Sequence, residues 1–290
     1  MDEIDLQIIK KLLINSRIAY RDLAEEIGLS VGAVHKRVQY LVEKGDIKTF
    51  IARPSFSALN AIVINIGGIS KLKSYDRVIE IFGENPYTIL FGISTGNYVY
   101  ITAVLRSISE MHNVTQNLTE ICKIEDPFIV IYNYPYQKVT GTLSKIDYQI
   151  IKSLNRDSRK SVSEVADETG LSSKTVSKHI NDMITNNLVS FTIEFEPSQE
   201  NDIVAIFHSY IPNSTDMKDV ISKIIQTISQ HLLYVRTYNN NPLFLSVHIL
   251  VKTLNQIQYF ENILKDIGLI DMIPRIIHKC YYFKCWLDHL

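Results

Sequence analysis

Residues 22–45 read DLAEEIGLSVGAVHKRVQYLVEKG, and the chain contains this pattern twice. A shift of 142 positions aligns the stretch with residues 164–187, EVADETGLSSKTVSKHINDMITNN. Both copies predict a short helix, a tight turn at Gly-Leu-Ser and a longer helix, with Ser30 or Ser172 as the N-cap. An internal repeat of this kind predicts a chain built from two similar halves.

The repeat extends outward from these helices without a gap. The matched positions of the first half are Ile4, Asp5, Ile8, Ile9, Leu12, Ser16, Arg17 and Ala24, and those of the second are Ile146, Asp147, Ile150, Ile151, Leu154, Ser158, Arg159 and Ala166. Together with a length of 290 residues, this match favours several small domains over one large domain.

The composition is that of an ordinary globular protein, with 46% hydrophobic and 21% charged residues. No apolar run reaches the roughly 20 residues that span a bilayer, and the acidic N-terminus does not resemble a secretory signal. Three cysteines do not form a disulfide framework, so we expect a cytoplasmic protein. A net charge of −1 argues against a surface coated in basic residues, but DNA affinity depends on where the cations lie.

Apolar periodicity predicts three helices in the first head, at residues 2–15, 20–27 and 30–44. In the third of these, Val34, Val38 and Leu41 share one face and should be buried, and Gly45 should end the helix. Residues 47–51 then alternate as a wing-like strand that Arg53-Pro54 interrupts, and residues 188–193 repeat this wing in the second half.

Each head is followed by a segment of strand and helix patterns in the order βαββαβ. In the first half the strands are expected at 61–69, 88–94, 98–105 and 127–132, with helices at 75–82 and 107–121 and a linker at 132–138; in the second half the strands are expected at 203–211, 233–238, 244–251 and 273–283, with helices at 218–229 and 255–267. The predicted class is α+β, with two winged helix-turn-helix domains alternating with two ferredoxin-like βαββαβ domains. The expected boundaries are 1–53, 58–137, 143–197 and 202–290. Because each domain is small, we expect the two βαββαβ units to pair with each other.

The helix-turn-helix pattern predicts binding to double-stranded DNA, because an exposed helix face can enter the major groove while lysines hold phosphates. The candidate DNA-binding residues are polar, small or basic: Ser30, Gly32, His35, Lys36, Gln39 and Lys48 in the first half, and Ser173, Lys174, Thr175, Ser177, Lys178 and Asn181 in the second. The alternative is a three-helix bundle that keeps the shape without binding DNA.

These motifs resemble the Lrp/AsnC family of feast/famine transcription regulators. The resemblance is carried by Asn15-Ser16-Arg17, Leu23-Ala24, Gly28-Leu29-Ser30, Val34 with Val38, and the run Gly45-Asp46-Ile47-Lys48-Thr49-Phe50. It implies that the βαββαβ units are RAM-type sensing and dimerising domains. Usual members carry one head and one sensor per chain and form homodimers, so this tandem chain resembles a covalent pseudo-dimer that acts on a pseudo-palindromic site. Assembly into a homo-oligomer is left open.

The resemblance also implies an amino-acid effector site near the hairpin of the first sensor, at Ser94, Thr95, Gly96 and Asn97. The glycine of the family pattern is present at Gly96, but Val99 stands where an acidic residue would pair with an α-amino group. The alternative is a hairpin without a ligand. Asn239-Asn240-Asn241 occupies the equivalent hairpin of the second half, and we expect no effector there.

The C-terminal segment holds Cys280, Cys285, His278 and His289, which are zinc-competent residue types. Their spacing matches no short zinc signature, so an aromatic strand without metal is the preferred interpretation. No Walker loop, HExxH, GxGxxG or nucleophile elbow occurs, and we expect neither an enzyme nor a cofactor.

Two other functions are compatible with this architecture. Siroheme decarboxylases share it, and a tetrapyrrole site of that kind would need His and Arg residues such as His231, Arg236 and His248. The His-Asn-Tyr-x-x-Arg type of run that we associate with that family is missing. The third alternative is a scaffold that only dimerises.

Overall fold

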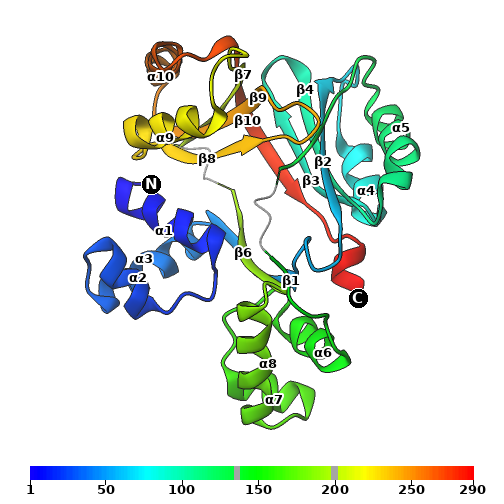
Figure 1. Cartoon of the computed structure of the whole chain (residues 1–290), viewed down its shortest axis with the longest axis vertical. Helices are drawn as coiled ribbons and strands as arrows, with labels where there is room; N and C mark the ends of the chain where they lie inside the picture. Colours follow the sequence, from blue (N-terminus) through cyan, green and yellow to red (C-terminus); the bar gives the residue numbers. More distant parts are fainter. Residues whose placement is uncertain (134–137, 197–201) are drawn as a thin grey trace.

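The computed structural model describes residues 1–133, 138–196 and 202–290, and it confirms the α+β class (Figure 1). The predicted linker at 132–138 lies largely outside the described residues. Head 1 contains α1 (Glu3–Ile14), α2 (Tyr20–Ile27), α3 (Val31–Glu43) and β1 (Ile47–Pro54), and head 2 contains α6 (Lys145–Leu154), α7 (Val162–Thr169), α8 (Ser173–Thr185) and β6 (Val189–Phe195).

Two βαββαβ units, here called sheet unit 1 and sheet unit 2, follow the heads. Sheet unit 1 contains β2 (Ile62–Ile69), α4 (Asp76–Glu84), β3 (Thr88–Ser94), η1 (Thr95–Asn97), β4 (Tyr98–Leu105), η2 (Ile108–Glu110), α5 (Met111–Cys122) and β5 (Phe128–Ile131); sheet unit 2 contains β7 (Ile203–Tyr210), α9 (Met217–Ile228), β8 (Leu232–Thr237), β9 (Phe244–Val251), α10 (Leu254–Ile267) and β10 (Ile270–Tyr282). A short helix, η3 (Trp286–His289), follows β10.

The first helix of each head begins at the same local signal. Asp2 caps α1 and Ser144 caps α6, and in both cases the aspartate three residues later returns the hydrogen bond, at Asp5 and Asp147. In the turn between the second and third helices, Gly28 and Gly170 have φ angles of +71° and +70°. Glycine adopts this left-handed conformation without a steric penalty, so the turn forms at the same place in both heads.

The two sheet units join into one sheet of order β5-β2-β4-β3-β10-β7-β9-β8. Within each unit this order is the ferredoxin-like one, and β3 pairs with the long strand β10 to connect the units. At the two outer edges Tyr132 bridges Tyr238, so β5 and β8 also approach each other. The expected pairing of the two units is therefore present.

The helices cover the outer faces of this sheet. Figure 1 shows α4 and α5 outside sheet unit 1, and α9 and α10 outside sheet unit 2. One apolar core lies under each pair of helices, centred on Phe82 and Phe91 in sheet unit 1 and on Phe207 and Leu264 in sheet unit 2. The inner faces of the two units are turned toward each other and toward β1 and β6. No helix in the described parts of the chain is long and apolar enough to cross a bilayer.

The strands predicted as wings differ from the expectation in their pairing. β1 pairs antiparallel with β6, and its register runs through Arg53 and Pro54 to Val189. Each head therefore contributes its strand to a ribbon shared with the other head, rather than forming a wing of its own. Edge pairing on one side leaves Pro54 without a required donor, which explains why this proline does not end the strand earlier.

Candidate functional site

The third helix of head 1 presents a buried face and an exposed face. The Ser30 Oγ accepts a hydrogen bond from the Ala33 N–H at 3.2 Å, which starts α3. Val34, Val38 and Leu41 are buried, as the periodicity predicted. The side of the helix that carries the candidate residues is exposed, and it contains Ser30, Gly32, His35, Lys36 and Gln39.

The equivalent helix of head 2 differs in detail. Ser173, Lys174, Lys178 and Asn181 are exposed, whereas Thr175 and Ser177 are half-buried. The Thr175 hydroxyl is hydrogen-bonded to the Ser172 Oγ at 2.8 Å, and the Thr175 N–H donates to the same oxygen at 3.1 Å. Thr175 is therefore part of the helix cap, and this limits its freedom to contact another molecule.

Two candidate or neighbouring cations have partners within the protein. Lys48 lies on β1, where its Nζ is 3.4 Å from the Glu196 carboxylate. Arg37 points to α1 and donates to Asp2 and Asp5, each at 2.7 Å. The charge expected from the run His35-Lys36-Arg37 is consequently divided, because Arg37 holds the head together while Lys36 stays exposed.

The two heads are joined along a seam made by Ser16, Arg17, Ser158 and Arg159. The hydroxyls of Ser16 and Ser158 are 2.6 Å apart. Arg17 donates to the Ser158 and Lys160 carbonyls, and Arg159 donates reciprocally to those of Ser16 and Ile18. Each residue of this head seam meets its own repeat partner 142 positions away, so a pseudo-twofold axis passes through it.

The β1–β6 ribbon follows the same symmetry, since Phe50 pairs with Ile193 and Ile51 with Thr192. Burial lowers the pKa of both seam arginines from the usual value, although both remain strongly basic groups. Arg159 also stacks over Tyr20, and Tyr20 in turn meets the edge of the His35 ring at 5.3 Å. The head seam therefore fixes α3 and α8 relative to each other.

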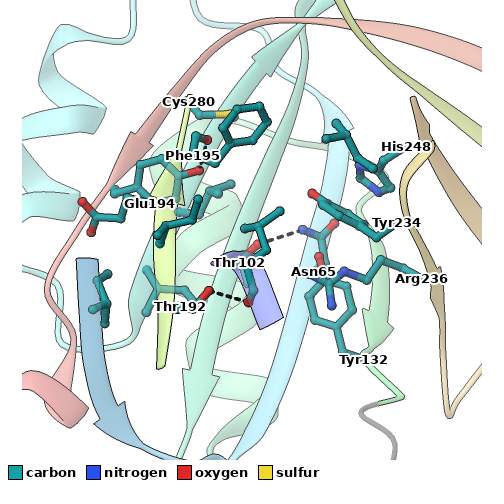
Figure 2. Close-up of a pocket in the computed structure, with 18 of the residues that line it drawn as sticks. Asn65, Thr102, Tyr132, Thr192, Glu194, Phe195, Tyr234, Arg236, His248 and Cys280 are labelled. Atoms are coloured by element: carbon teal, nitrogen blue, oxygen red, sulfur yellow. Dashed lines mark hydrogen bonds between the residues drawn. The ribbon is translucent and has the colours of Figure 1, made fainter. Parts of the chain in front are cut away.

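A cavity of about 630 Å³ lies between the sheet units, with the β1–β6 ribbon along one side. Figure 2 shows Asn65, Tyr132, Tyr234, Arg236 and His248 gathered on one side of it, across from Thr192, Glu194 and Phe195 of β6. This volume is in the usual range for sites that bind small molecules.

The aromatic and polar groups of this cavity are tightly connected. The rings of Tyr234 and His248 lie 4.3 Å apart, and Arg236 sits over the Tyr234 ring at 4.5 Å and the Tyr132 ring at 5.3 Å. The Asn65 amide donates to the Thr102 hydroxyl at 3.2 Å. The cavity can thus offer stacking surfaces and hydrogen-bonding groups to one ligand.

Two histidines of the cavity are held in the neutral state. His208 Nε2 is 3.2 Å from the Tyr100 hydroxyl, and burial, aided by Arg275, lowers the pKa of His208 to about 4. His248 Nε2 is 3.1 Å from the Ser246 hydroxyl, and burial, followed by the charge of Arg236, lowers its pKa well below the usual value. At neutral pH both rings are therefore uncharged hydrogen-bonding groups.

The acids around the cavity already have cationic partners. Glu194 pairs with Arg156, Glu196 with Lys48 at 3.4 Å, and Asp202 with Lys252 at 2.5 Å. Three cations, Arg53, Arg236 and Lys279, also line the space. The cavity has no large excess of either charge.

The hairpin expected to bind an effector is separate from this cavity. Thr95–Asn97 form a single helical turn, and the Thr95 hydroxyl accepts a hydrogen bond from the Ile276 N–H at 3.2 Å. Ser94 is buried, and its hydroxyl donates to the Tyr98 carbonyl at 2.9 Å. Gly96 and Asn97 are exposed, and none of these four residues lines the cavity.

The C-terminal cysteines lie apart in function as well. Cys280 lines the cavity, whereas Cys285 is fully buried beside sheet unit 1. Within the described residues no group of three or more His, Cys, Asp or Glu side chains could hold a metal ion. His231 also lies outside the cavity, where its ring contacts Phe260 at 4.7 Å.

Sequence reasoning missed the cavity itself. Its signal lay in β8 and β9, where polar residues alternate with buried apolar ones: Tyr234, Arg236 and Tyr238 on one strand, and Ser246 and His248 on the other. Alternation places all five on the inner face of the sheet. Polar residues on the inner face of an otherwise apolar strand indicate a lined cavity when two sheets face each other.

Comparison with known proteins identifies both heads independently. An AsnC-type helix-turn-helix domain matches residues 1–42, and a winged helix-turn-helix DNA-binding domain matches residues 143–190. An uncharacterised helix-turn-helix-type transcriptional regulator of Pyrococcus furiosus is 31% identical over 130 residues, which cover 43% of this chain and 88% of that protein. The regulatory protein AsnC of Haemophilus influenzae is 28% identical over 117 residues, covering 39% of this chain and 78% of that protein.

Among solved structures, the siroheme decarboxylase NirDL resembles the whole chain. The TM-score is 0.62 at 14% sequence identity, and the match covers 99% of this chain and 94% of NirDL. At this identity the likeness establishes a shared fold.

The fold, the paired heads and the domain matches define a tandem protein with two helix-turn-helix DNA-binding domains. The chain belongs to the Lrp/AsnC-type family of helix-turn-helix regulators.

Proposed function

We propose that this protein is a sequence-specific transcription regulator that binds double-stranded DNA with both heads and does not act as an enzyme. The observation that carries the proposal is the head seam, which holds the exposed faces of α3 and α8 in one pseudo-twofold arrangement. Two recognition helices related in this way suit two half-sites about one helical turn, or a multiple of it, apart.

The exposed faces of the two helices carry different residues, so the preferred site should be an imperfect palindrome. His35 and Gln39 of α3 correspond to Ser177 and Asn181 of α8, whereas Lys36 and Lys178 are the same residue type. The lysines suit phosphate contacts, which are independent of sequence, and the residues that differ suit base edges. A small-molecule effector, where one exists, would act by favouring one arrangement of heads and sheet units.

The proposal can be tested by selecting bound duplexes from a random-sequence library at two salt concentrations. We expect enrichment of a pseudo-palindrome with unequal half-sites and an affinity that falls steeply with salt. Weak binding without enrichment would instead favour a non-specific architectural role. Absence of binding to every duplex would overturn the proposal.

A second candidate function is a siroheme-decarboxylase-like activity on a tetrapyrrole. It is supported by the likeness of fold to NirDL and by the cavity, which brings together His208, Arg236 and His248. The charges support it less well, because an anionic macrocycle needs a surplus of cations, whereas Arg53, Arg236 and Lys279 face three acids. Arg236 and His248 were anticipated for this role, and His231 lies elsewhere.

This candidate can be separated from the first by titrating the purified protein with an iron uroporphyrin and following the absorbance of the macrocycle. A saturable spectral change that is lost in Arg236→Ala would favour the tetrapyrrole function. An unchanged spectrum at micromolar protein, together with an enriched DNA site, would leave the regulator as the function.

A further inference from the structure

The two sheet units carry equivalent apolar faces beside the heads. In each unit the second residue of the first strand pairs with the next-to-last residue of the third strand, as Val63 with Val104 and Val204 with Leu250. The second residue of the next strand completes each face, and it is Ile89 in β3 and Leu233 in β8. Docking face 1 is therefore Val63, Ile89 and Val104, and docking face 2 is Val204, Leu233 and Leu250.

Head 1 covers docking face 2. Leu233 and Leu250 are 7% and 5% exposed and belong to the same apolar cluster as Leu6 and Ile9 of α1. The Lys10 ammonium of α1 donates to the Ser229 carbonyl at 3.0 Å, immediately after the end of α9. At the other end of the contact, Lys44 follows α3 and lies 3.6 Å from the Asp202 carboxylate.

Docking face 1 is covered by the C-terminal segment, residues 285–290, instead of by head 2. Cys285 and Leu287 are 0% and 2% exposed and cluster with Val63 and Val104. The Trp286 N–H donates to the Pro86 carbonyl at 2.7 Å, and its indole N–H donates to the Val104 carbonyl at 2.9 Å. Pro86 lies two residues beyond α4, close to the position that Ser229 holds beyond α9.

Head 2 lies apart from sheet unit 1. In Figure 1 it forms the foot of the molecule, with the C-terminal segment between it and sheet unit 1. Among the described residues, its buried core contains residues of its own helices, Ala52 and the β6 strand, but none of β2 to β5. The Asn155 amide donates to Asp288 at 3.2 Å, so head 2 touches the C-terminal segment where its counterpart touches a sheet.

The head 2 residues that correspond to the docking contacts of head 1 are open. Tyr148 stands at the position of Leu6 and is half-buried, whereas Leu6 is 4% exposed. Lys152 stands at the position of Lys10 and is exposed. An aromatic residue and a lysine at these positions retain the apolar contact and the donor that head 1 uses.

We propose that docking face 1 is a second docking site for a head, that its occupant is head 2 of the same chain, and that the C-terminal segment competes for it. When the segment leaves, Tyr148 would pack on Val63 and Val104, and Lys152 would donate to a carbonyl after α4 in place of Trp286. The buried Cys285 and Leu287 make this segment a specific occupant rather than a loose tail, because their burial is what the docked head must replace.

The test is a distance measurement by pulsed electron paramagnetic resonance between spin labels at Asp167→Cys on α7 and Glu80→Cys on α4. Both positions are exposed. Cys280→Ala removes the thiol that lines the cavity, and Cys122 and Cys285 are fully buried. The labelled full chain is compared with the same chain ending at Lys284.

We expect one long distance in the full chain and, in the shortened chain, a shorter distance in at least half of the molecules. Adding Tyr148→Asp to the shortened chain should remove the shorter distance, because a carboxylate cannot be buried on an apolar face without a partner. Should the shortened chain aggregate, Trp286→Ala with Leu287→Ala in the full chain carries the test, with a smaller fraction of the short distance expected.

An unchanged distance distribution in both variants would overturn the proposal. A shorter distance that disappears on dilution with an excess of unlabelled protein would also overturn it, since the occupant would then be a head of a second copy.

Discussion

Lys36 and Lys178 occupy the same position of the repeat, one on each recognition helix, and both are exposed. A lysine that neutralises one phosphate releases about one counterion on binding. Lys36→Ala should therefore weaken binding to the selected duplex and make the slope of log affinity against log salt shallower by about 1. Fluorescence anisotropy at several salt concentrations measures both quantities.

Lys223→Ala is the matched control, because Lys223 is equally exposed but lies on α9 of sheet unit 2. Its affinity and salt slope should equal those of the unchanged protein. If Lys36→Ala behaves in the same way as this control, α3 does not contact the phosphates.

His208 makes the stability of the fold depend on pH. Its pKa in the folded protein is about 4, because burial opposes protonation, whereas an unfolded histidine takes up a proton near pH 6.5. Between these values the unfolded chain binds more protons, so the free energy of unfolding falls as pH falls. His208 alone should cost about 2 kcal/mol between pH 6.5 and pH 5.

Urea unfolding at these two pH values, in the unchanged protein and in His208→Gln, measures this contribution. Glutamine can still hydrogen-bond the Tyr100 hydroxyl but does not titrate. The variant should lose less stability over the interval than the unchanged protein, with the carboxylates and His248 contributing equally to both. Parallel losses in the two proteins would contradict the assignment.

Residue positions on the recognition helices could be predicted because a helical period assigns each side chain to a buried or an exposed face. Val34 and Val38 are buried and Lys36 is exposed, as their spacing requires. The cavity could not be predicted in this way, because Asn65 and Glu194 come from strands about 130 residues apart in the chain and meet only after the units assemble. The same reason hid His208, which had no local motif.

At the scale of elements, the head seam should control whether the two heads act together. Arg159 donates to two main-chain carbonyls of head 1, and Arg159→Ala leaves both without this donor. The loss should lower the free energy of unfolding by about 1–3 kcal/mol. It should also weaken binding to the paired site much more than binding to an isolated half-site.

Arg21→Ala is a suitable control, since this arginine lies on α2 with a side chain that is 86% exposed. Its effect on stability should stay within about 0.5 kcal/mol. Equal losses for paired and isolated sites in Arg159→Ala would show that the head seam stabilises the heads without setting their spacing.

Element boundaries followed closely from periodicity and capping residues, whereas pairings between distant elements did not. The strand after each head was expected, but its partner was not, because β1 and β6 lie about 140 residues apart and each reads as an ordinary short strand. The long strand β10 is similar. Its two halves pair with β7 and β3, and nothing in its own residues indicates that it serves both sheet units.

At the scale of the whole molecule, the tandem chain can do what a homodimer cannot, which is to carry two different recognition faces at a fixed spacing. The pseudo-twofold head seam predicts the spacing of the half-sites, and the differences between α3 and α8 predict their unequal sequences. Making the two faces alike should therefore make the preferred DNA site symmetric.

Ser177→His with Asn181→Gln gives head 2 the residues that head 1 carries at His35 and Gln39. Because the lysines and the head seam are untouched, overall affinity and half-site spacing should be retained, while the site selected from a random library should shift toward a perfect palindrome of the head 1 half-site. The reciprocal variant, His35→Ser with Gln39→Asn, should select a palindrome of the other half-site. If both variants select the original site, base recognition resides outside these positions, and the asymmetry of the site would then have to come from the DNA shape that the fixed heads impose.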